Sequence, residues 1–507
     1  LLAFALLTEN SCSKKVEGRT DNLPALNPSD IDMDAGTWKR VLLSRPDSFA
    51  VAVPAAVTLP GYLGELNEVK GFQANLTSAQ HSSVKYWSAG VVLRFNELMR
   101  ELVAKHNLPP YQNADGTYPI PSGANPFAYP QFPFSNPPYA ARAYAYVSAA
   151  QYDALIACWH YKKLYGRMAP YKYDSAINAN ALAVKTDLPS YPSAEAVVAG
   201  VTAEMMKMLF PTDIAYINEK IDELKIATLA SGACVRSDWT AGETLGRQVA
   251  SVFAARGRAD NTGRAVGTPE LWAKLETDCI GRGEIPWLSR ETPKRPPMLP
   301  FFGNVRPFLF DSLTAISLIA PPPPATGSDA FKKETEEVAN YVNNVTRDQV
   351  AIVHFWADGA STYTPPGHWD AIAAEDFITQ NYSEVRWARN MALLNMSMMD
   401  AAIVCWKTKY FYFNPRPSQS DENIKTVPGL PNFPASTSGH STFRAAAATI
   451  LSHIIPANAS AYDAMAREAS LSRMYAGIHY RSDCEQGLIS GNKVGMYAVQ
   501  RAMTDGA

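Results

Sequence analysis

The chain has 507 residues, with 46 basic and 48 acidic side chains and a formal net charge of −2. This balance, with no basic tract, argues against a nucleic-acid or other polyanionic partner. The length allows a large core in one or two domains, and the 37 prolines predict long extended connections between helices.

The first residues resemble the end of an export signal. An apolar run, Leu1–Leu7, is followed by Cys12 in the context Ser-Cys-Ser-Lys-Lys, which is similar to a bacterial lipoprotein signal, although Glu9 and Asn10 depart from its usual small or apolar residues. We expect residues 1–29 to be a leader and linker of an exported protein that is periplasmic, secreted or an outer-membrane lipoprotein. The alternative is a frayed terminus in a cytoplasmic protein. A lipid on Cys12 would be the only membrane attachment, because no later window has 18 uninterrupted apolar residues.

Helical periodicity dominates the remainder of the chain, and no sustained period-two alternation indicates a strand. The sequence therefore predicts an almost all-α fold. Helices are expected over residues 87–106, 138–165, 194–209, 212–231, 241–255, 328–344, 383–410, 438–454, 459–476 and 484–503. Residues 285–327, which include the run Pro321–Pro324, predict a loop-rich crossover.

Three segments recur in the same order at nearly constant spacing. Asp153–Lys162 matches Asp400–Lys409 at an offset of 247, and Gly232–Asp238 matches Gly477–Asp483 at 245. Residues 189–195 also echo 434–440 at 245. We therefore predict two related helical bundles, an N-terminal half over residues 30–284 and a C-terminal bundle over 328–507, joined by the crossover.

The two copies differ at positions where chemistry would occur. Glu195, Cys234 and Thr228 of the first copy stand where the second has His440, His479 and Arg473. Packing explains residues that both copies share, whereas the histidines and the arginine of the second copy need another explanation. We expect the first bundle to be scaffold and the second to carry the functional site.

The second copy gathers positive and imidazole groups within 75 residues: Lys409, Arg416, His440, Arg473 and His479. Arginine forks and a lysine suit a tetrahedral oxyanion such as phosphate or vanadate. Ser438 and the backbone N–H of Gly439, at the start of a predicted helix, would add neutral donors at its positive end. Asp483 lies four residues after His479, so on a helical turn its carboxylate could orient one ring nitrogen of the histidine.

These residues fall into three motifs: Lys409-x6-Arg416-Pro417, Ser438-Gly439-His440 and Ser472-Arg473-x5-His479-x3-Asp483. They resemble the signature of the superfamily that includes the vanadium haloperoxidases and the type 2 phosphatidic acid phosphatases. The motifs cover about 80 residues, and the doubled helical organisation resembles the haloperoxidase branch. Thr437 stands where the family usually has proline, which we interpret as a change in helix entry.

The resemblance implies that vanadate is the cofactor and that His479 is its apical ligand. Lys409, Arg416, Ser438, Gly439 and Arg473 would hold the oxygens, and His440 would be the acid–base. Vanadium would stay pentavalent and act as a Lewis acid on hydrogen peroxide, with Lys409 polarising the bound peroxide, so that halide is oxidised to hypohalous acid. An organic acceptor could then be halogenated.

Three features favour the haloperoxidase branch. Trp406 and Phe433 resemble the aromatic pair beside the halide in fungal chloroperoxidase. Asp358, in Phe-Trp-Ala-Asp-Gly, resembles an aspartate that pairs with the third-motif arginine, here Arg473. The chain also contains a whole bundle that minimal phosphatases lack. Against this, Trp406 matches Trp159 of the first copy and could be core, Phe433 could be packing, and an aspartate before glycine is often a turn residue.

Two other functions remain open. In a phosphatase of the same superfamily, His479 would be the phosphorylated nucleophile and His440 the acid for the leaving group. A non-catalytic oxyanion-binding lipoprotein is the third possibility. The remaining histidines lack partners at ligand spacing, although His354 and His368 could border the site.

Overall fold

The computed structural model describes residues 23–108, 114, 137–179, 188–291, 294–427 and 429–507. In this part of the chain the regular structure is helical apart from one isolated bridge between Met168 and Pro189, which confirms the predicted all-α class. None of the helices there is long and apolar enough to cross a membrane. Most of the expected leader, with Cys12, lies outside the described residues and stays a prediction.

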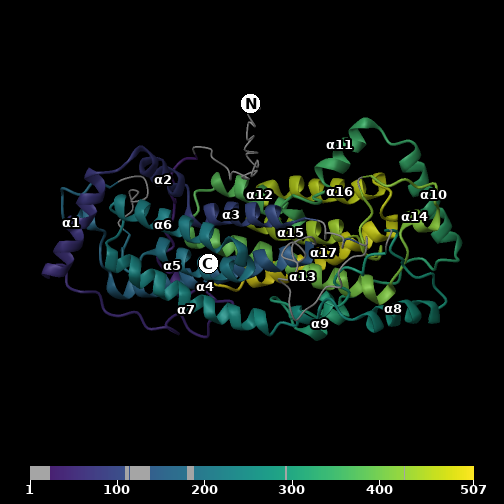
Figure 1. Cartoon of the computed structure of the whole chain (residues 1–507), viewed down its shortest axis with the longest axis horizontal. Coiled ribbons are helices and arrows are strands. Elements are labelled where there is room, and N and C mark those ends of the chain that lie inside the picture. The colour runs from purple at the N-terminus through teal and green to yellow at the C-terminus, as the bar shows by residue number, and fades with distance from the viewer. Residues whose placement is uncertain (1–22, 109–113, 115–136, 180–187, 292–293, 428) are drawn as a thin grey trace, which may run out of the picture.

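Seventeen α-helices are formed by the described residues (Figure 1). They are α1 (Pro60–Ala74), α2 (Ser78–Ser88), α3 (Val91–His106), α4 (Pro137–Tyr165), α5 (Ala194–Leu209), α6 (Ile214–Ala230), α7 (Arg236–Arg258), α8 (Pro269–Gly281), α9 (Ser312–Ser317), α10 (Asp329–Asn343), α11 (Arg347–Phe355), α12 (Thr364–Ile378), α13 (Glu384–Tyr412), α14 (Pro417–Ser420), α15 (Gly439–Ile454), α16 (Ala459–Tyr475) and α17 (Arg481–Ala502).

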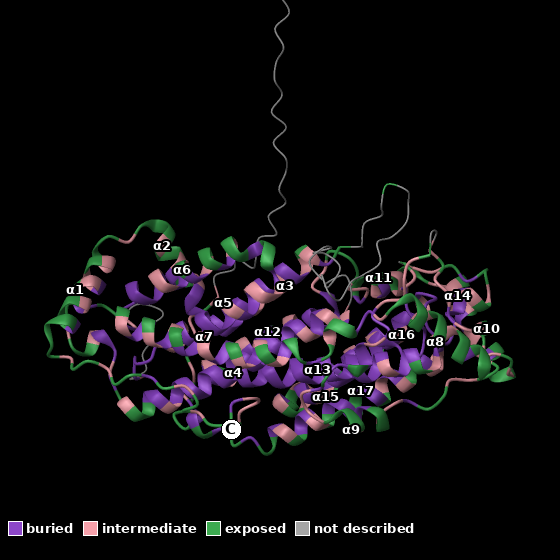
Figure 2. Cartoon of the chain, turned by 60° about the horizontal axis from the view of Figure 1, so that its bottom comes forward, coloured by how far each residue is buried: buried purple, intermediate pink, exposed green. Residues whose placement is uncertain are grey.

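Helices α4 and α13, each of 29 residues, form the centre of the molecule. They pack against each other, and both are buried along nearly their whole length (Figure 2). The many alanines of α4 bring its backbone close to its neighbours at little cost in side-chain entropy. The largest hydrophobic cluster contains residues from both halves, from Ala35 to Ala502, so the two halves of the chain share one core.

The same arrangement surrounds each central helix. In the N-terminal half α4 packs against α5 and α7, and in the C-terminal half α13 packs against α15 and α17. The helices α5 and α15 have 16 residues each, α6 and α16 have 17 each, and each pair begins 245 residues apart. The spatial arrangement follows the sequence repeat, while the common descent of the halves and the domain boundaries stay predictions.

Peripheral contacts repeat as well. Glu68 of α1 binds Arg236 at the start of α7, and Glu337 of α10 binds Arg481 at the start of α17. Both ion pairs are partly exposed, so each contributes only about 0–1 kcal/mol and serves mainly to orient a peripheral helix.

Several helix boundaries differ from the prediction. The single helix expected over residues 87–106 is two helices, because Gly90 adopts φ +123°, a conformation that ends α2 and opens α3. Helices α1, α8, α11, α12 and α14, and most of α2, were not expected. Within 285–327 the described residues form α9 and one 3-10 turn, Phe302–Asn304, and the role of this segment as a crossover between two bundles stays a prediction.

Candidate oxyanion site

The three motifs converge at the ends of five helices of the C-terminal half. Lys409 lies in the last turn of α13, and Arg416 lies just before α14. The Ser-Gly-His motif opens α15, Arg473 lies in the last turn of α16, and His479 lies two residues before the start of α17. Because helix ends leave backbone donors and acceptors free, this meeting point supplies polar groups as well as side chains.

His479 is held in one orientation. Its Nδ1 lies 3.1 Å from Oδ2 of Asp483, and its Nε2 lies 3.0 Å from Nη1 of Arg416. A guanidinium cannot accept a hydrogen bond, so Nε2 carries the lone pair and Nδ1 carries the proton that is donated to Asp483. The histidine therefore presents a basic nitrogen toward Arg416, as required of a metal ligand or a nucleophile.

Asp483 also accepts from the backbone N–H of Tyr480 at 3.0 Å and so caps the start of α17. The predicted pairing of the carboxylate with the histidine four residues earlier is thus present. Burial raises the pKa of Asp483, and this is opposed by the Tyr480 N–H and by the charges of Lys409 and Arg416.

Arg416 is fully buried and donates to protein groups on two sides. Its Nε reaches the carbonyl of Phe433 at 2.9 Å, and Nη1 reaches the carbonyl of Ile478 at 2.6 Å. Its Nη2 is buried without a hydrogen-bond partner among the described residues. An unsatisfied buried donor costs about 1–3 kcal/mol, so this atom is suited to an acceptor supplied by a ligand.

Lys409 is also fully buried and donates to the carbonyls of Pro434 and Ala435, each at 2.9 Å. Lys162 of the N-terminal half makes the corresponding bond to the carbonyl of Pro189. The lysine is therefore common to both halves, in agreement with the sequence repeat that pairs Lys162 with Lys409. Each lysine holds the loop before the next helix of its half, α5 or α15, and this structural role explains why both halves contain a lysine here.

Burial and mutual repulsion weaken the protonated forms in the site. Burial lowers the pKa of Arg416 to about 10 and that of Arg473 to about 9, and the latter is lowered further by Arg444. Burial, then Arg416 and Lys409, hold the pKa of His479 well below its usual value. Burial lowers the pKa of Lys409 too, with a further contribution from Arg416. An oxyanion would reverse these shifts, because each cation would gain an opposite charge.

His440 lies on the first turn of α15. Its Nε2 is 3.2 Å from the carbonyl of Ala357, so Nε2 carries the proton and Nδ1 can accept one. Burial, followed by Arg473 and Arg444, lowers the pKa of His440 well below its usual value. The residue is therefore neutral near pH 7, as a general base must be.

The start of α15 offers neutral donors. The hydroxyl oxygen of Ser438 accepts from the backbone N–H of Ser441 at 3.4 Å, which leaves its own O–H free to donate. A Cβ placed on Gly439 would lie 3.7 Å from the Trp406 ring, an ordinary contact. Packing against the protein therefore does not demand glycine here, and the absence of a side chain leaves the backbone open to close approach by a ligand.

Asp358 does not make the expected ion pair. Its carboxylate accepts from Arg444 at 2.5 Å and lies 2.9 Å from Nδ1 of His368, whereas Arg473 donates to Ser472 and to the carbonyl of Val353. Asp358 pairs with Arg444 because this arginine lies one helical turn after His440 on α15, within reach of the carboxylate.

Two residues beside the site, Arg444 and His368, were not predicted as partners of Asp358. Arg444 lies 4.2 Å over the ring of Trp356, and His368 packs against the same ring. The i, i+4 spacing of His440 and Arg444 was the available signal for the arginine. His368 was expected only as a possible border residue, because its partner Asp358 comes from another element.

Trp406 and Phe433 form an aromatic wall on the site. Their ring centroids are 5.1 Å apart, and the Lys409 ammonium lies 4.9 Å from the Phe433 ring. The Trp406 indole N–H donates to the carbonyl of Met298, which fixes that ring. The predicted pair is thus adjacent, and Phe433 also lies against the Arg416 guanidinium, at 5.0 Å.

Residues 390–504 match the family model of the PAP2 superfamily. No curated protein matches the chain in sequence. Among solved structures, the chain is similar to a bacterial vanadium-dependent iodoperoxidase, with 23% identity and a TM-score of 0.57 over 72% of this chain and 91% of that one. It is also matched by a holo-type bacterial vanadium-dependent chloroperoxidase, with 12% identity and a TM-score of 0.49 over 78% of this chain and 98% of that one.

The matched segment contains all three motifs. Over 72% of its length the chain shares the helical fold of the vanadium-dependent iodoperoxidase, and the predicted resemblance is confirmed at the level of the fold.

Proposed function

We propose that this protein is a vanadate-dependent haloperoxidase, which oxidises halide with hydrogen peroxide to hypohalous acid. The observation that carries the proposal is the lone pair on Nε2 of His479, fixed by Asp483 on one side and facing the buried guanidinium of Arg416 on the other. The unpartnered Nη2 of that guanidinium indicates room for a ligand oxygen.

The residues present fit a tetrahedral oxyanion. His479 would be the protein ligand of vanadium, while Lys409, Arg416, Arg473, Ser438 and the N–H of Gly439 would hold the oxygens. Pentavalent vanadium supplies Lewis-acid activation of hydrogen peroxide toward halide. His440 would accept a proton from the peroxide at Nδ1, and Lys409 would stabilise the negative charge that develops on oxygen. The wall of Trp406 and Phe433 would exclude water beside the incoming halide.

The test is halide oxidation by purified protein with vanadate, peroxide and chloride, bromide or iodide in separate reactions. Turnover that requires vanadate and disappears in His479→Ala supports the proposal. Saturable vanadate binding without halide oxidation under any condition would overturn it and leave an oxyanion-binding protein.

Phosphate-ester hydrolysis is the second candidate, because the same Nε2 lone pair could attack phosphorus. The bond from phosphorus to the leaving oxygen would break as His440, protonated at Nδ1, gives its proton to that oxygen, and water would then hydrolyse the phosphohistidine. Release of phosphate from p-nitrophenyl phosphate without vanadate, with no halide oxidation in its presence, would favour this candidate.

We also propose that the protein is exported and carries lipid on Cys12. Labelling of the expressed precursor with a palmitate analogue, lost in Cys12→Ser, is the expected result. A protein found unlabelled in the cytosolic fraction would contradict the proposal.

A further inference from the structure

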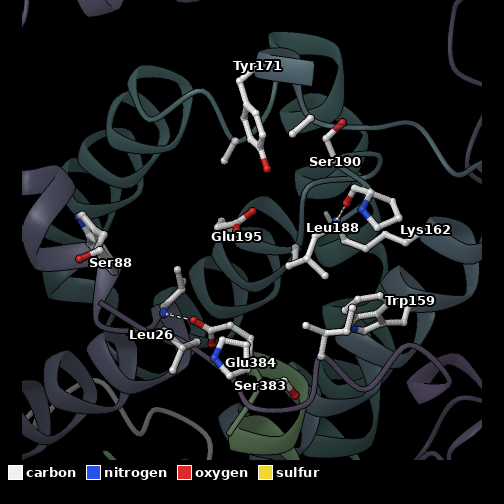
Figure 3. A pocket seen from close by; sticks show the side chains of 18 residues that line it. Leu26, Ser88, Trp159, Lys162, Tyr171, Leu188, Ser190, Glu195, Ser383 and Glu384 are labelled. Atoms are coloured by element: carbon white, nitrogen blue, oxygen red, sulfur yellow. Dashed lines mark hydrogen bonds between the residues drawn. The ribbon is translucent and has the colours of Figure 1, made fainter. Parts of the chain in front are cut away.

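The N-terminal half contains a cavity at the place that corresponds to the oxyanion site. It has a volume of about 110 Å³ and lies among the ends of α2 and α4 and the starts of α3, α5 and α13 (Figure 3). Trp159, Lys162 and Glu195 line it, and these residues stand 247, 247 and 245 positions before Trp406, Lys409 and His440.

The cavity contains carboxylates that the C-terminal site lacks, although it keeps the equivalent lysine, Lys162. Glu195 replaces a histidine, Ala233 stands beside the position of the second histidine, and no arginine lines the cavity. Lys162, 4% exposed, directs its ammonium to the carbonyl of Pro189. Lys162 and Glu195 form no ion pair with each other, although both lie in the described part of the chain.

A second carboxylate, from the other half of the molecule, closes one side. Glu384, at the start of α13, accepts from the backbone N–H groups of Val91 at 2.5 Å and Val92 at 3.1 Å. It therefore occupies the positive end of α3, which could otherwise have attracted an anion. Burial raises the pKa of Glu384 to about 7, and the charge of Glu195 raises it further.

The walls are aromatic and apolar. Trp87 and Trp159 are at most 5% exposed, and Leu26 and Leu188 also line the cavity. Figure 3 shows Glu195 near the middle of the cavity, with Tyr171 pointing its hydroxyl toward it. One Glu195 oxygen accepts from Ser193 at 2.7 Å, which leaves the other oxygen for a ligand.

We propose that this cavity binds a small organic cation, a primary ammonium on a flat apolar body. The ammonium would bind the Glu195 carboxylate, and the apolar body would lie against Trp159 and the two leucines. A desolvated charge-assisted hydrogen bond to Glu195 supplies specificity, and the indole of Trp159 offers a flat apolar surface to the body of the ligand. The site is separate from the oxyanion site and does not depend on the proposed function.

The test is calorimetric titration of the full chain, without vanadate, with phenethylammonium as the probe. 3-Phenylpropionate and phenylalanine serve as anionic and zwitterionic probes of similar size. We expect saturable binding of the cation that weakens at least about tenfold in Glu195→Gln, as loss of a charge-assisted bond implies. Glu219→Gln, an exposed change on α6, is the matched control and should bind as the wild type does.

Leu188→Trp, which fills the cavity without changing its charge, should also abolish binding. This second variant tests the proposal independently if Glu195→Gln fails to fold. Halide oxidation should be unchanged in both variants. Preferential binding of either the anion or the zwitterion, or cation binding that survives both substitutions, would overturn the inference.

Discussion

The two halves of the molecule use equivalent aspartates differently. Asp238 and Asp483, 245 residues apart, each cap the start of their helix by accepting a backbone N–H, from Val235 at 2.9 Å and from Tyr480 at 3.0 Å. The remaining capacity of Asp238 goes to Arg167, whereas that of Asp483 goes to His479. The capping role is common to both, and the partner distinguishes them, because only Asp483 contacts a histidine of the candidate oxyanion site.

Residues with a structural role can therefore be distinguished from candidate site residues by comparing equivalent positions of the two halves. The indole of Trp87 donates to Glu223 and that of Trp356 to Glu468, at equivalent positions of the halves. These repeated bonds hold helices together and indicate no catalysis. Comparison of the halves therefore identifies the groups whose removal should affect the ligand and those whose removal should affect only stability.

The largest contrast is expected at His479 and its counterpart Cys234. His479→Ala should lower vanadate affinity and halide oxidation by at least about 100-fold, because the ligand nitrogen is lost. Cys234→Ala should leave both unchanged, since that thiol lies buried in the other half. Vanadate titration and dye halogenation measure both quantities, and an equal loss in the two variants would remove the distinction between the halves.

Next in size is the pair of arginines. Arg167→Met leaves the buried carboxylate of Asp238 without its partner, so the free energy of unfolding should fall by about 3–5 kcal/mol while vanadate affinity is retained. Arg416→Met should instead weaken vanadate binding by at least about tenfold, the value of one charge-assisted hydrogen bond. Urea unfolding and vanadate titration on both proteins test this; unchanged vanadate affinity in Arg416→Met would contradict it.

A smaller effect concerns pH and the buried aspartates of the central helices. Asp400 accepts from the N–H groups of Phe308 and Leu309, and burial raises its pKa to about 7. The folded state therefore holds a proton that the unfolded chain releases near pH 4, and this stabilisation is lost as the pH rises through about 7.

Asp400→Asn should consequently lower the free energy of unfolding more at pH 5 than at pH 8. Asp153→Asn is the matched change in α4, where burial also raises the carboxyl pKa and three backbone N–H groups are bound. Unfolding in urea at both pH values gives the differences. A cost of Asp400→Asn that grows toward pH 8 would contradict the sign.

The smallest contrast is expected at the paired tryptophans. Trp406→Phe removes part of the aromatic wall and its bond to Met298, so the KM for halide should change by about 2- to 10-fold. Trp159→Phe should leave halide kinetics unchanged. Steady-state kinetics with bromide and iodide decide between a halide-facing role and core packing for Trp406, and identical kinetics in the two variants would favour packing.

Much of the architecture could be predicted from the sequence, because apolar periodicity of 3.6 residues survives along α5, α6, α13, α15 and α16. Helix α12 was missed because it begins Thr364-Pro-Pro-Gly, which indicates a loop by composition, yet proline is tolerated in a first helical turn. Helix α11 is only nine residues long and offers too few periodic positions.

The site was predictable to the extent that its residues lie in short motifs. The contact of His479 with Arg416 and Asp483 follows from motif membership and i, i+4 spacing. The partner of Asp358 could not be predicted, because Arg444 and His368 come from two helices whose packing the sequence alone does not determine. The cavity around Glu195 was equally hidden, since Glu384 reaches it from the opposite half.

The side-by-side packing of α4 and α13 has a consequence for how the protein can change over time. Lys409 and Trp406 lie on α13, which packs against α4, a helix about 250 positions earlier in the chain. A bulky replacement of a buried alanine in α4 would therefore displace α13 and the two site residues that it carries. Packing against α13 thereby restricts which side chains the N-terminal half can accept along α4. This restriction comes from the geometry of a neighbouring helix and is independent of any ligand that the N-terminal half itself binds.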